Sequence, residues 1–153
     1  MEAFRRRGTT CLARLTQNEA AVLGTLAGEL AELVQPLRIK DDEWLPDPAT
    51  LRLFPDAYRD DADASLEFRR FTQADQATIK AESAQIVIAD ISDADDGWVT
   101  VTPDHVTAWL TTLTNLRLVL ATRLDTDPRA ATEAVFDWCG WIQQSLLETV
   151  AAA

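Results

Sequence analysis

Residues 113–121 read LTNLRLVLA, an apolar run that is interrupted by a single arginine, Arg117. When the surrounding residues are placed on a helix at about 100° per residue, the large apolar side chains form one stripe, and Arg117 falls near its centre. The stripe consists of Val106, Trp109, Leu110, Leu113, Leu120 and Leu124. With Thr102 as a cap and Pro103 in the first turn, the pattern predicts a helix over residues 103–124 that turns one charge toward the core.

A guanidinium in a core stripe must be paired. Arginine stays protonated in proteins and carries five N–H donors, and leaving such a charge buried without a partner costs several kcal/mol. We therefore predict that Arg117 forms a buried structural salt bridge and is not a catalytic group. The candidate partners are Glu67, Asp137 and Asp56, with Glu67 as first choice and Asp137 as second.

The N-terminal third of the chain predicts another helix. Thr16 and Glu19 have the spacing of a capping box, in which each residue satisfies a backbone N–H of the other. Leucines and valines then recur every three or four residues up to position 37. Gly24 and Gly28 lie four residues apart on this helix, a spacing that we interpret as a site of close helix packing.

Further helices are expected in the middle and at the end of the chain. Asp47 and Pro48 predict the start of a short helix in an acidic, proline-containing stretch. Thr72 resembles a helix cap, which predicts one helix that ends at Phe71 and a longer one from Gln73 to about residue 90. A last helix is expected over residues 128–150.

These elements predict the fold class. The chain has 153 residues with only 5 glycines and 6 prolines, and its length suits one domain. We expect an all-α single domain over residues 1–153, a bundle of about five to six helices. A minor pairing of the β-hairpin kind is allowed between residues 10–15 and 98–102, because residues 98–101 alternate between apolar and polar side chains.

Two surfaces are candidates for protein contacts. The face of the 103–124 helix opposite the apolar stripe carries small or weakly polar side chains with no charge, which is unusual for a solvent-exposed helix. We expect this face to be covered, either by another helix of the same chain or by a second subunit in a homodimer. In the last helix, Trp141 projects on the polar side, as interface tryptophans often do. The candidate interface residues are Thr107, Thr111, Thr112, Asn115, Thr122 and Trp141.

Charge and cysteine content exclude several function classes. The formal net charge is −11, and such a field repels nucleic acid and anionic membranes. The apolar runs are all shorter than the roughly 18 residues that a membrane span needs, so a cytoplasmic location is expected. Cys11 and Cys139 are far apart in sequence and are expected to be free thiols; they could act as a redox pair only if the fold brings their Cα atoms within about 7 Å.

Catalytic and metal-binding motifs are missing. The single histidine, His105, has no motif context, and there is no glycine-rich phosphate loop and no metal-protease pattern. The acidic stretch before Gly97 fails the register of a calcium loop, because Ala94 stands where an oxygen ligand is required. We therefore expect no catalytic residues, no metal and no cofactor.

Three stretches together resemble a known family: LRLFPDAYRDDADASLEFRR, AWLTTLTNLRLVLATRL and DWCGWIQQSLLETV. They are similar to an actinobacterial family of unknown function that includes the actinomycete oxidative stress regulators. The resemblance covers nearly the whole chain, although the acid that this family usually carries at the position of Asn115 is replaced here. It implies an intracellular, non-enzymatic regulatory role in transcription or stress response through protein contacts.

Function therefore stays open between three hypotheses. The first is a regulatory protein that acts through protein partners, with the transcription machinery as a candidate. The second is a DNA-binding regulator that uses a basic N-terminal arm, Arg5 to Arg7, together with Arg14. The third is a helical domain that binds a small molecule or a metal. The acidic composition favours the first.

Overall fold

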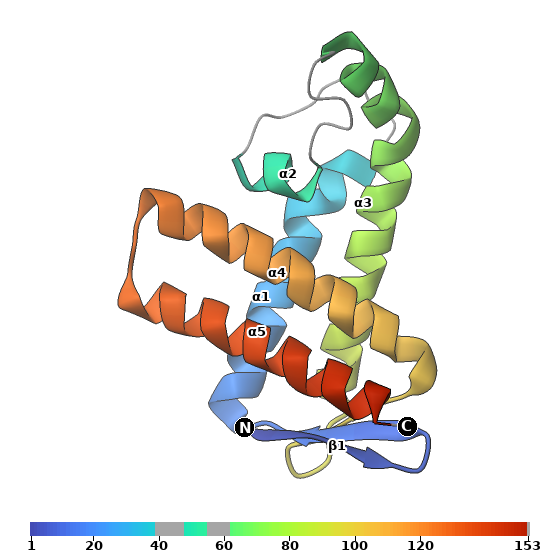
Figure 1. Cartoon of the computed structure of the whole chain (residues 1–153), viewed down its shortest axis with the longest axis vertical. Helices are drawn as coiled ribbons and strands as arrows, with labels where there is room; N and C mark the ends of the chain where they lie inside the picture. The colour runs from blue at the N-terminus through green and yellow to red at the C-terminus, as the bar shows by residue number, and fades with distance from the viewer. Residues whose placement is uncertain (39–47, 55–61, 153) are drawn as a thin grey trace.

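The computed structural model of the chain describes residues 1–38, 48–54 and 62–152. It contains four long α-helices, one short α-helix and a three-stranded sheet (Figure 1). In chain order the elements are β1 (Glu2–Arg7), β2 (Thr10–Arg14), α1 (Gln17–Val34), the 3₁₀ helix η1 (Gln35–Arg38), α2 (Pro48–Leu53), α3 (Ala62–Ser92), β3 (Trp98–Val101), the 3₁₀ helix η2 (Pro103–His105), α4 (Val106–Thr126) and α5 (Ala130–Ala151).

The prediction of an all-α bundle of five to six helices is wrong, because the N-terminal residues form a sheet. The strand order is β1-β2-β3, and both pairs are antiparallel. The pairing of residues 10–15 with residues 98–102 is present as β2 and β3, but it is the centre of a larger sheet. β1 was missed because its arginines show no alternation of apolar side chains. A two-residue turn with Gly8 at φ +62° folds it onto β2.

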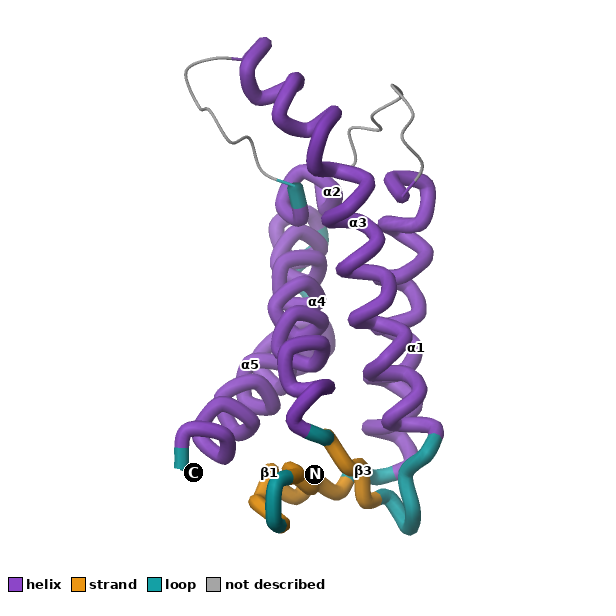
Figure 2. The backbone as a smooth tube through the Cα atoms, turned by 90° about the vertical axis from the view of Figure 1, so that its right-hand side faces the viewer, coloured by secondary structure: helices purple, strands orange, loops and turns teal. Residues whose placement is uncertain are grey.

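The helices pack in two layers above the sheet. α1 and α3 run alongside each other, and α4 and α5 form a helical hairpin that crosses them (Figures 1 and 2). The end of α5 rests on β1: Ser145 Oγ accepts from Phe4 N at 2.8 Å, and Thr149 Oγ1 donates to Phe4 O at 3.1 Å. Among the described residues, no helix combines the length and apolar character that a membrane span requires.

The start of α1 confirms the predicted capping box. Glu19 N donates to Thr16 Oγ1 at 3.2 Å, and Thr16 N donates to Glu19 Oε2 at 2.8 Å. The interpretation of Gly24 and Gly28 as a close packing site is wrong, because a Cβ at either position would meet no other atom within 4 Å. The spacing of two glycines therefore carries no packing information here.

α3 is a single helix, and the predicted break at Thr72 is wrong. A threonine inside a helix costs only a few tenths of a kcal/mol relative to alanine, so it does not end a helix that tertiary packing supports. That packing is provided by small buried side chains, which let α1 and α3 approach each other closely. Among the described side chains of α3, the buried apolar ones are Ala74, Ala77, Ala81, Ala84 and Val87.

The remaining helix predictions hold within a few residues. Pro48 begins α2, and the helices predicted over 103–124 and 128–150 are observed as α4 and α5. The first turn predicted at Pro103 is the 3₁₀ helix η2, which precedes α4. The core joins side chains of these helices to the inner face of the sheet, and its largest fully buried side chain is that of Trp109.

Candidate functional site

The sheet has two chemically different faces. On the inner face, β2 and β3 contribute buried core side chains: Cys11, Ala13, Val99 and Val101. Because side chains alternate along a strand, Arg14 and Trp98 project from the outer face, where they are direct cross-strand partners. β1 adds Arg5 opposite Leu12 and Arg7 opposite Thr10 on this same face.

Two arginines cover the indole ring of Trp98 on the outer face. Arg5 Cζ lies 4.4 Å from the ring centroid, and Arg14 Cζ lies 5.8 Å from it. Arg14 Nη2 also pairs with Asp96 Oδ2 at 3.0 Å, although both side chains are largely exposed. Exposed contacts of this kind hold the side chains weakly. The arginines can therefore exchange them for contacts with an anionic partner at little cost.

An open cleft of about 670 Å³ adjoins this face. It lies between the N-terminal strand, the end of β2, the first turn of α1 and the loop before β3. Its lining residues are Met1, Glu2, Arg14, Leu15, Thr16, Gln17, Ala20, Asp96 and Gly97. The arginine-rich face is thus continuous with a concave surface. We use the name outer sheet face for Arg5, Arg7, Arg14 and Trp98.

Gly97 positions the loop that carries Asp96. It has φ +80°, and a Cβ there would lie 2.6 Å from Leu15 O. Leu15 N donates to Gly97 O at 2.9 Å, so the loop is held directly against the end of β2. This contact fixes Asp96 beside Arg14.

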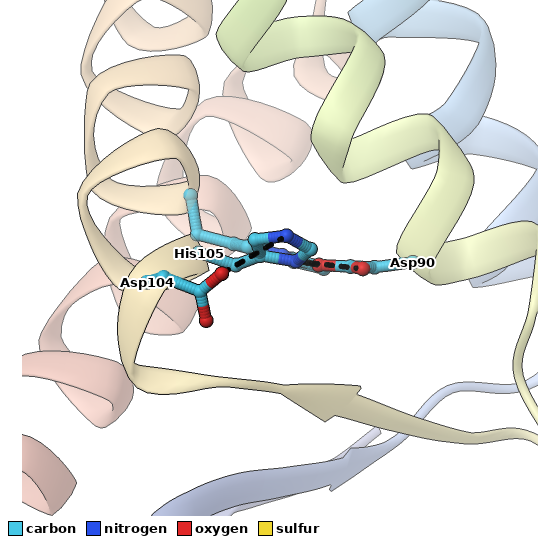
Figure 3. A network of polar contacts seen from close by, with 4 residues as sticks. Asp90, Asp104 and His105 are labelled. Atoms are coloured by element: carbon cyan, nitrogen blue, oxygen red, sulfur yellow. Dashed lines mark hydrogen bonds and ion pairs between the residues drawn. The ribbon is translucent and has the colours of Figure 1, made fainter.

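A carboxylate–histidine–tryptophan network joins the end of α3 to the start of α4. Figure 3 shows its carboxylate and histidine members, Asp90, Asp104 and His105. His105 Nδ1 lies 3.0 Å from both carboxylate oxygens of Asp90, and Trp109 Nε1 donates to Asp90 Oδ2 at 2.8 Å. The other ring nitrogen, Nε2, faces the Asp104 carboxylate at 3.9 Å. Among the described residues neither a hydroxyl nor a thiol forms a hydrogen bond with the imidazole. The network therefore fastens two helices and lacks the nucleophile of a catalytic triad.

Arg117 lies between α4 and α5. Its Nη1 donates to Gln143 Oε1 at 3.4 Å, and its Cζ lies 4.9 Å from the centroid of the Phe136 ring. Gly140 leaves room for the guanidinium, and Arg117 Nε is buried without a hydrogen-bond partner. Gln143 in turn donates to Thr114 Oγ1 at 2.6 Å. Arg117 is half-buried and connects the two helices through an amide and an aromatic ring.

Of the three predicted carboxylate partners of Arg117, the structure describes only the side chain of Asp137. Asp137 is exposed on α5, and no carboxylate lies within 4.0 Å of Arg117 among the described residues. Asp56 and the side chain of Glu67 lie outside the described part of the chain. The pairing with these two residues stays a prediction.

The weakly polar face of α4 is largely covered within the chain. Thr112, Asn115 and Thr122 are buried, and Lys80 of α3 donates to Asn115 Oδ1 at 3.3 Å. Thr107 at the start of α4 is exposed, and Thr111 is half-buried. Helix α3 of the same chain therefore covers part of the face for which a second subunit was the other expected cover. Trp141 on α5 is 44 % exposed, as its position on the polar side indicated.

Both cysteines are free and buried. Cys139 is fully buried in the α5 core stripe, and burial raises the pKa of its thiol to about 11, while the nearby charge of Arg117 partly opposes this. Burial likewise raises the pKa of Cys11. A raised pKa keeps a thiol protonated and unreactive at neutral pH.

Sequence reasoning missed the roles of Trp98, Asp90 and Lys80. A signal existed for Trp98, because the expected pairing of residues 10–15 with 98–102 places it opposite Arg14 in the observed register. For Asp90 and Lys80 the signal is non-local, since their partners lie 15 or more residues away on another helix. A local sequence pattern does not select which distant side chain each of them contacts.

The comparisons with known proteins place the chain in one family. The family model of a domain of unknown function, DUF2017, matches residues 1–150. The chain therefore belongs to the DUF2017 family. Neither the curated proteins nor the solved structures gave a significant match.

Proposed function

We propose that this protein is a non-enzymatic regulatory protein that acts through protein–protein contacts, and that the outer sheet face is its contact surface. The observation that carries the proposal is the gathering of arginines beside Trp98 on that face, in a chain whose formal net charge is −11. Tryptophan and arginine are the side chains that most often dominate binding energy at protein interfaces. Charge complementarity then indicates a partner with an acidic segment.

A protein partner is favoured over nucleic acid. Four arginines lie in the first two strands, but Asp96 and Glu2 adjoin them, and the rest of the chain is strongly acidic. Phosphate-backbone binding by such a molecule would be opposed by its overall field. An acidic segment of a partner protein needs complementary positive charge only at the outer sheet face. The similarity to oxidative stress regulators supports a place in intracellular stress response or transcription, and with it a partner from the transcription machinery.

The test uses fluorescence anisotropy with two labelled probes at low salt: a 15-residue Glu/Leu/Phe peptide and a random-sequence DNA duplex. We expect the peptide to bind the wild-type protein, with affinity that falls as salt is added. The double variant Arg5→Glu/Arg14→Glu should lose this binding. The double variant Arg123→Glu/Arg129→Glu is the control, because it makes the same change in net charge at two exposed arginines that lie near the turn between α4 and α5.

Three outcomes contradict the proposal. Peptide binding that survives in the double variant removes the outer sheet face as the surface. Duplex binding in place of peptide binding, with the same arginine dependence, makes the protein a nucleic-acid binder. If neither probe binds, the outer sheet face has no anionic partner. If the peptide binds as expected, affinity capture from cells with the wild-type protein and the double variant Arg5→Glu/Arg14→Glu would identify the physiological partner.

A further inference from the structure

Where α4 crosses α1 (Figure 1), the two helices leave an open groove of about 310 Å³. Both helices contribute apolar side chains to its lining. Those of α1 are spaced by four and three residues and so share one face of the helix. The apolar lining residues are Leu26, Leu30 and Leu33 of α1 and Leu116, Val119 and Leu120 of α4. The groove shares no residue with the outer sheet face or with the cleft beside it.

The apolar lining continues along α1 beyond the groove. Val22 precedes Leu26 by one turn on the same face, and it is 40 % exposed. Leu26 and Leu33 are half-buried, so the three side chains form an apolar strip on the accessible side of α1. From Val22 to Leu33 the strip is about 17 Å long at 1.5 Å per residue, which is about three turns of a helix.

The charges at the rim of the groove are mainly negative. The charged lining residues are Glu29 and Glu32 of α1 and Arg123 of α4. Arg123 Nη2 pairs with Glu29 Oε2 at 3.1 Å, and both side chains are about half exposed. Glu32 is exposed and has no ion pair within 4.0 Å among the described residues. One negative charge at the rim is therefore uncompensated, in a chain whose formal net charge is −11.

The distribution of polar groups fits a helix better than a small molecule. Small-molecule sites combine an apolar pocket with a few polar groups that fix the orientation of the ligand. Here the leucine and valine side chains of the lining offer no hydrogen-bonding group, and its three charged side chains are exposed to solvent. An amphipathic helix needs no more than this, because it lays its apolar face into a groove and keeps its polar residues outside.

We propose that the groove between α1 and α4 binds an amphipathic helix of a partner protein, and that lysine or arginine flanks the apolar face of that helix. Its apolar residues, spaced by three or four positions, lie along the strip from Val22 to Leu33. A basic residue beside them pairs with Glu32, and the negative field of the chain accelerates the encounter. The groove thus selects a charge opposite to that of the acidic segment proposed for the outer sheet face.

The experiment measures fluorescence anisotropy of three labelled peptides of about 16 residues with the full chain. The first peptide has leucines at helical spacing with lysines beside them. The second has glutamates in place of the lysines, and the third has the composition of the first in scrambled order. We expect the scrambled peptide to bind at least about tenfold more weakly than the first, because it has the same charge but no apolar face.

The double variant Leu26→Ala/Leu33→Ala tests the apolar lining. It should weaken binding of the lysine peptide by about tenfold or more, because it removes apolar surface that the peptide covers. Circular dichroism checks that the variant is folded. The matched control is Leu147→Ala/Val150→Ala, which truncates two exposed apolar side chains of α5 outside the groove and should leave the affinity unchanged.

Glu32→Lys tests the rim charge and leaves the apolar lining intact. It should weaken binding of the lysine peptide by about threefold or more. Glu82→Lys makes the same change in charge at an exposed position of α3 that does not line the groove, and it should weaken binding less. Arg5→Glu/Arg14→Glu should not weaken it at all, so the groove and the outer sheet face are tested independently.

Four results would overturn the proposal. Equal binding of the lysine peptide and its scrambled form would show attraction by charge alone. A glutamate peptide whose affinity depends on Leu26 and Leu33 would give the partner the opposite charge. A wild-type dimer in light scattering that Leu26→Ala/Leu33→Ala converts to a monomer would make a second copy of the chain the occupant. If neither the lysine nor the glutamate peptide binds in a way that depends on these leucines, the groove accepts no amphipathic helix.

Discussion

Gly140 of α5 lies directly against the guanidinium of Arg117 on α4. A Cβ at this glycine would meet Arg117 Nε at 3.3 Å and Cζ at 3.4 Å. The two residues are thus complementary in shape, because the absence of a side chain at position 140 leaves the space that the arginine occupies. This relationship explains how a charge in the middle of an apolar run is accommodated.

Substitution of Gly140 by alanine should have an effect that depends on Arg117. Gly→Ala inside a helix is worth about 1 kcal/mol from propensity alone, but here the new methyl group presses on the guanidinium. We expect Gly140→Ala to stabilise the Arg117→Ala background more than the wild type, with a coupling of about 0.5–1 kcal/mol. Urea unfolding of the four proteins of this cycle measures it. Equal effects in both backgrounds would show that the contact is not restrictive.

Gly24 and Gly28 of α1, unlike Gly140, should accept an alanine without any change elsewhere in the protein. At either position a Cβ would have no other atom within 4 Å. Gly24→Ala and Gly28→Ala should therefore each raise the free energy of unfolding by about 0.5–1 kcal/mol, because alanine loses less backbone entropy in a helix. Thermal or urea unfolding is the measurement. Destabilisation by either alanine would restore the packing interpretation that the glycine spacing first indicated.

Gly97 should tolerate no side chain. Its φ of +80° and the 2.6 Å approach of a Cβ to Leu15 O together predict that Gly97→Ala destabilises by about 1–3 kcal/mol. Gly8 is the matched control, because it has φ +62° but no atom within 4 Å of the Cβ position. Gly8→Ala should cost less than Gly97→Ala in the same unfolding assay. If the two costs are equal, backbone strain alone accounts for both.

Local patterns predicted the parts of this fold that local interactions determine. The capping box at Thr16, the start of α2 at Pro48 and the two C-terminal helices each depend on residues within a few positions of one another. β1 could not be predicted in this way, because it is held by hydrogen bonds to β2 and α5 and its own residues show no strand pattern. The same holds for the contacts of Arg117: the helical stripe required a partner but could not select one.

The network around Asp90 predicts a graded loss of stability. Trp109 is 1 % exposed, and its Nε1–H donates to Asp90. Asp90→Ala leaves that donor buried without an acceptor, which costs about 1–3 kcal/mol. Asp90→Asn retains an acceptor oxygen and should cost less. In the Asp90→Ala background, Trp109→Phe should destabilise less than it does in wild type, because the orphaned N–H is removed. Urea unfolding tests this, and an additive result would show that the two residues are not coupled.

Cys139 should make the stability of the protein depend on pH in the alkaline range. Burial raises the pKa of its thiol from 9.0 to about 11, so the folded state holds the proton more tightly than the unfolded chain does. The stabilisation is therefore complete below pH 9 and is lost as the pH rises from 9 to 11. The comparison protein is Cys139→Ala, in which other titrating groups contribute alike. The measurement is urea unfolding of both proteins from about pH 7 to 11. Between pH 9 and 11 the free energy of unfolding of the wild type should fall relative to that of the variant. A difference that stays constant with pH would mean that the thiol ionises as readily in the folded protein as in the unfolded chain.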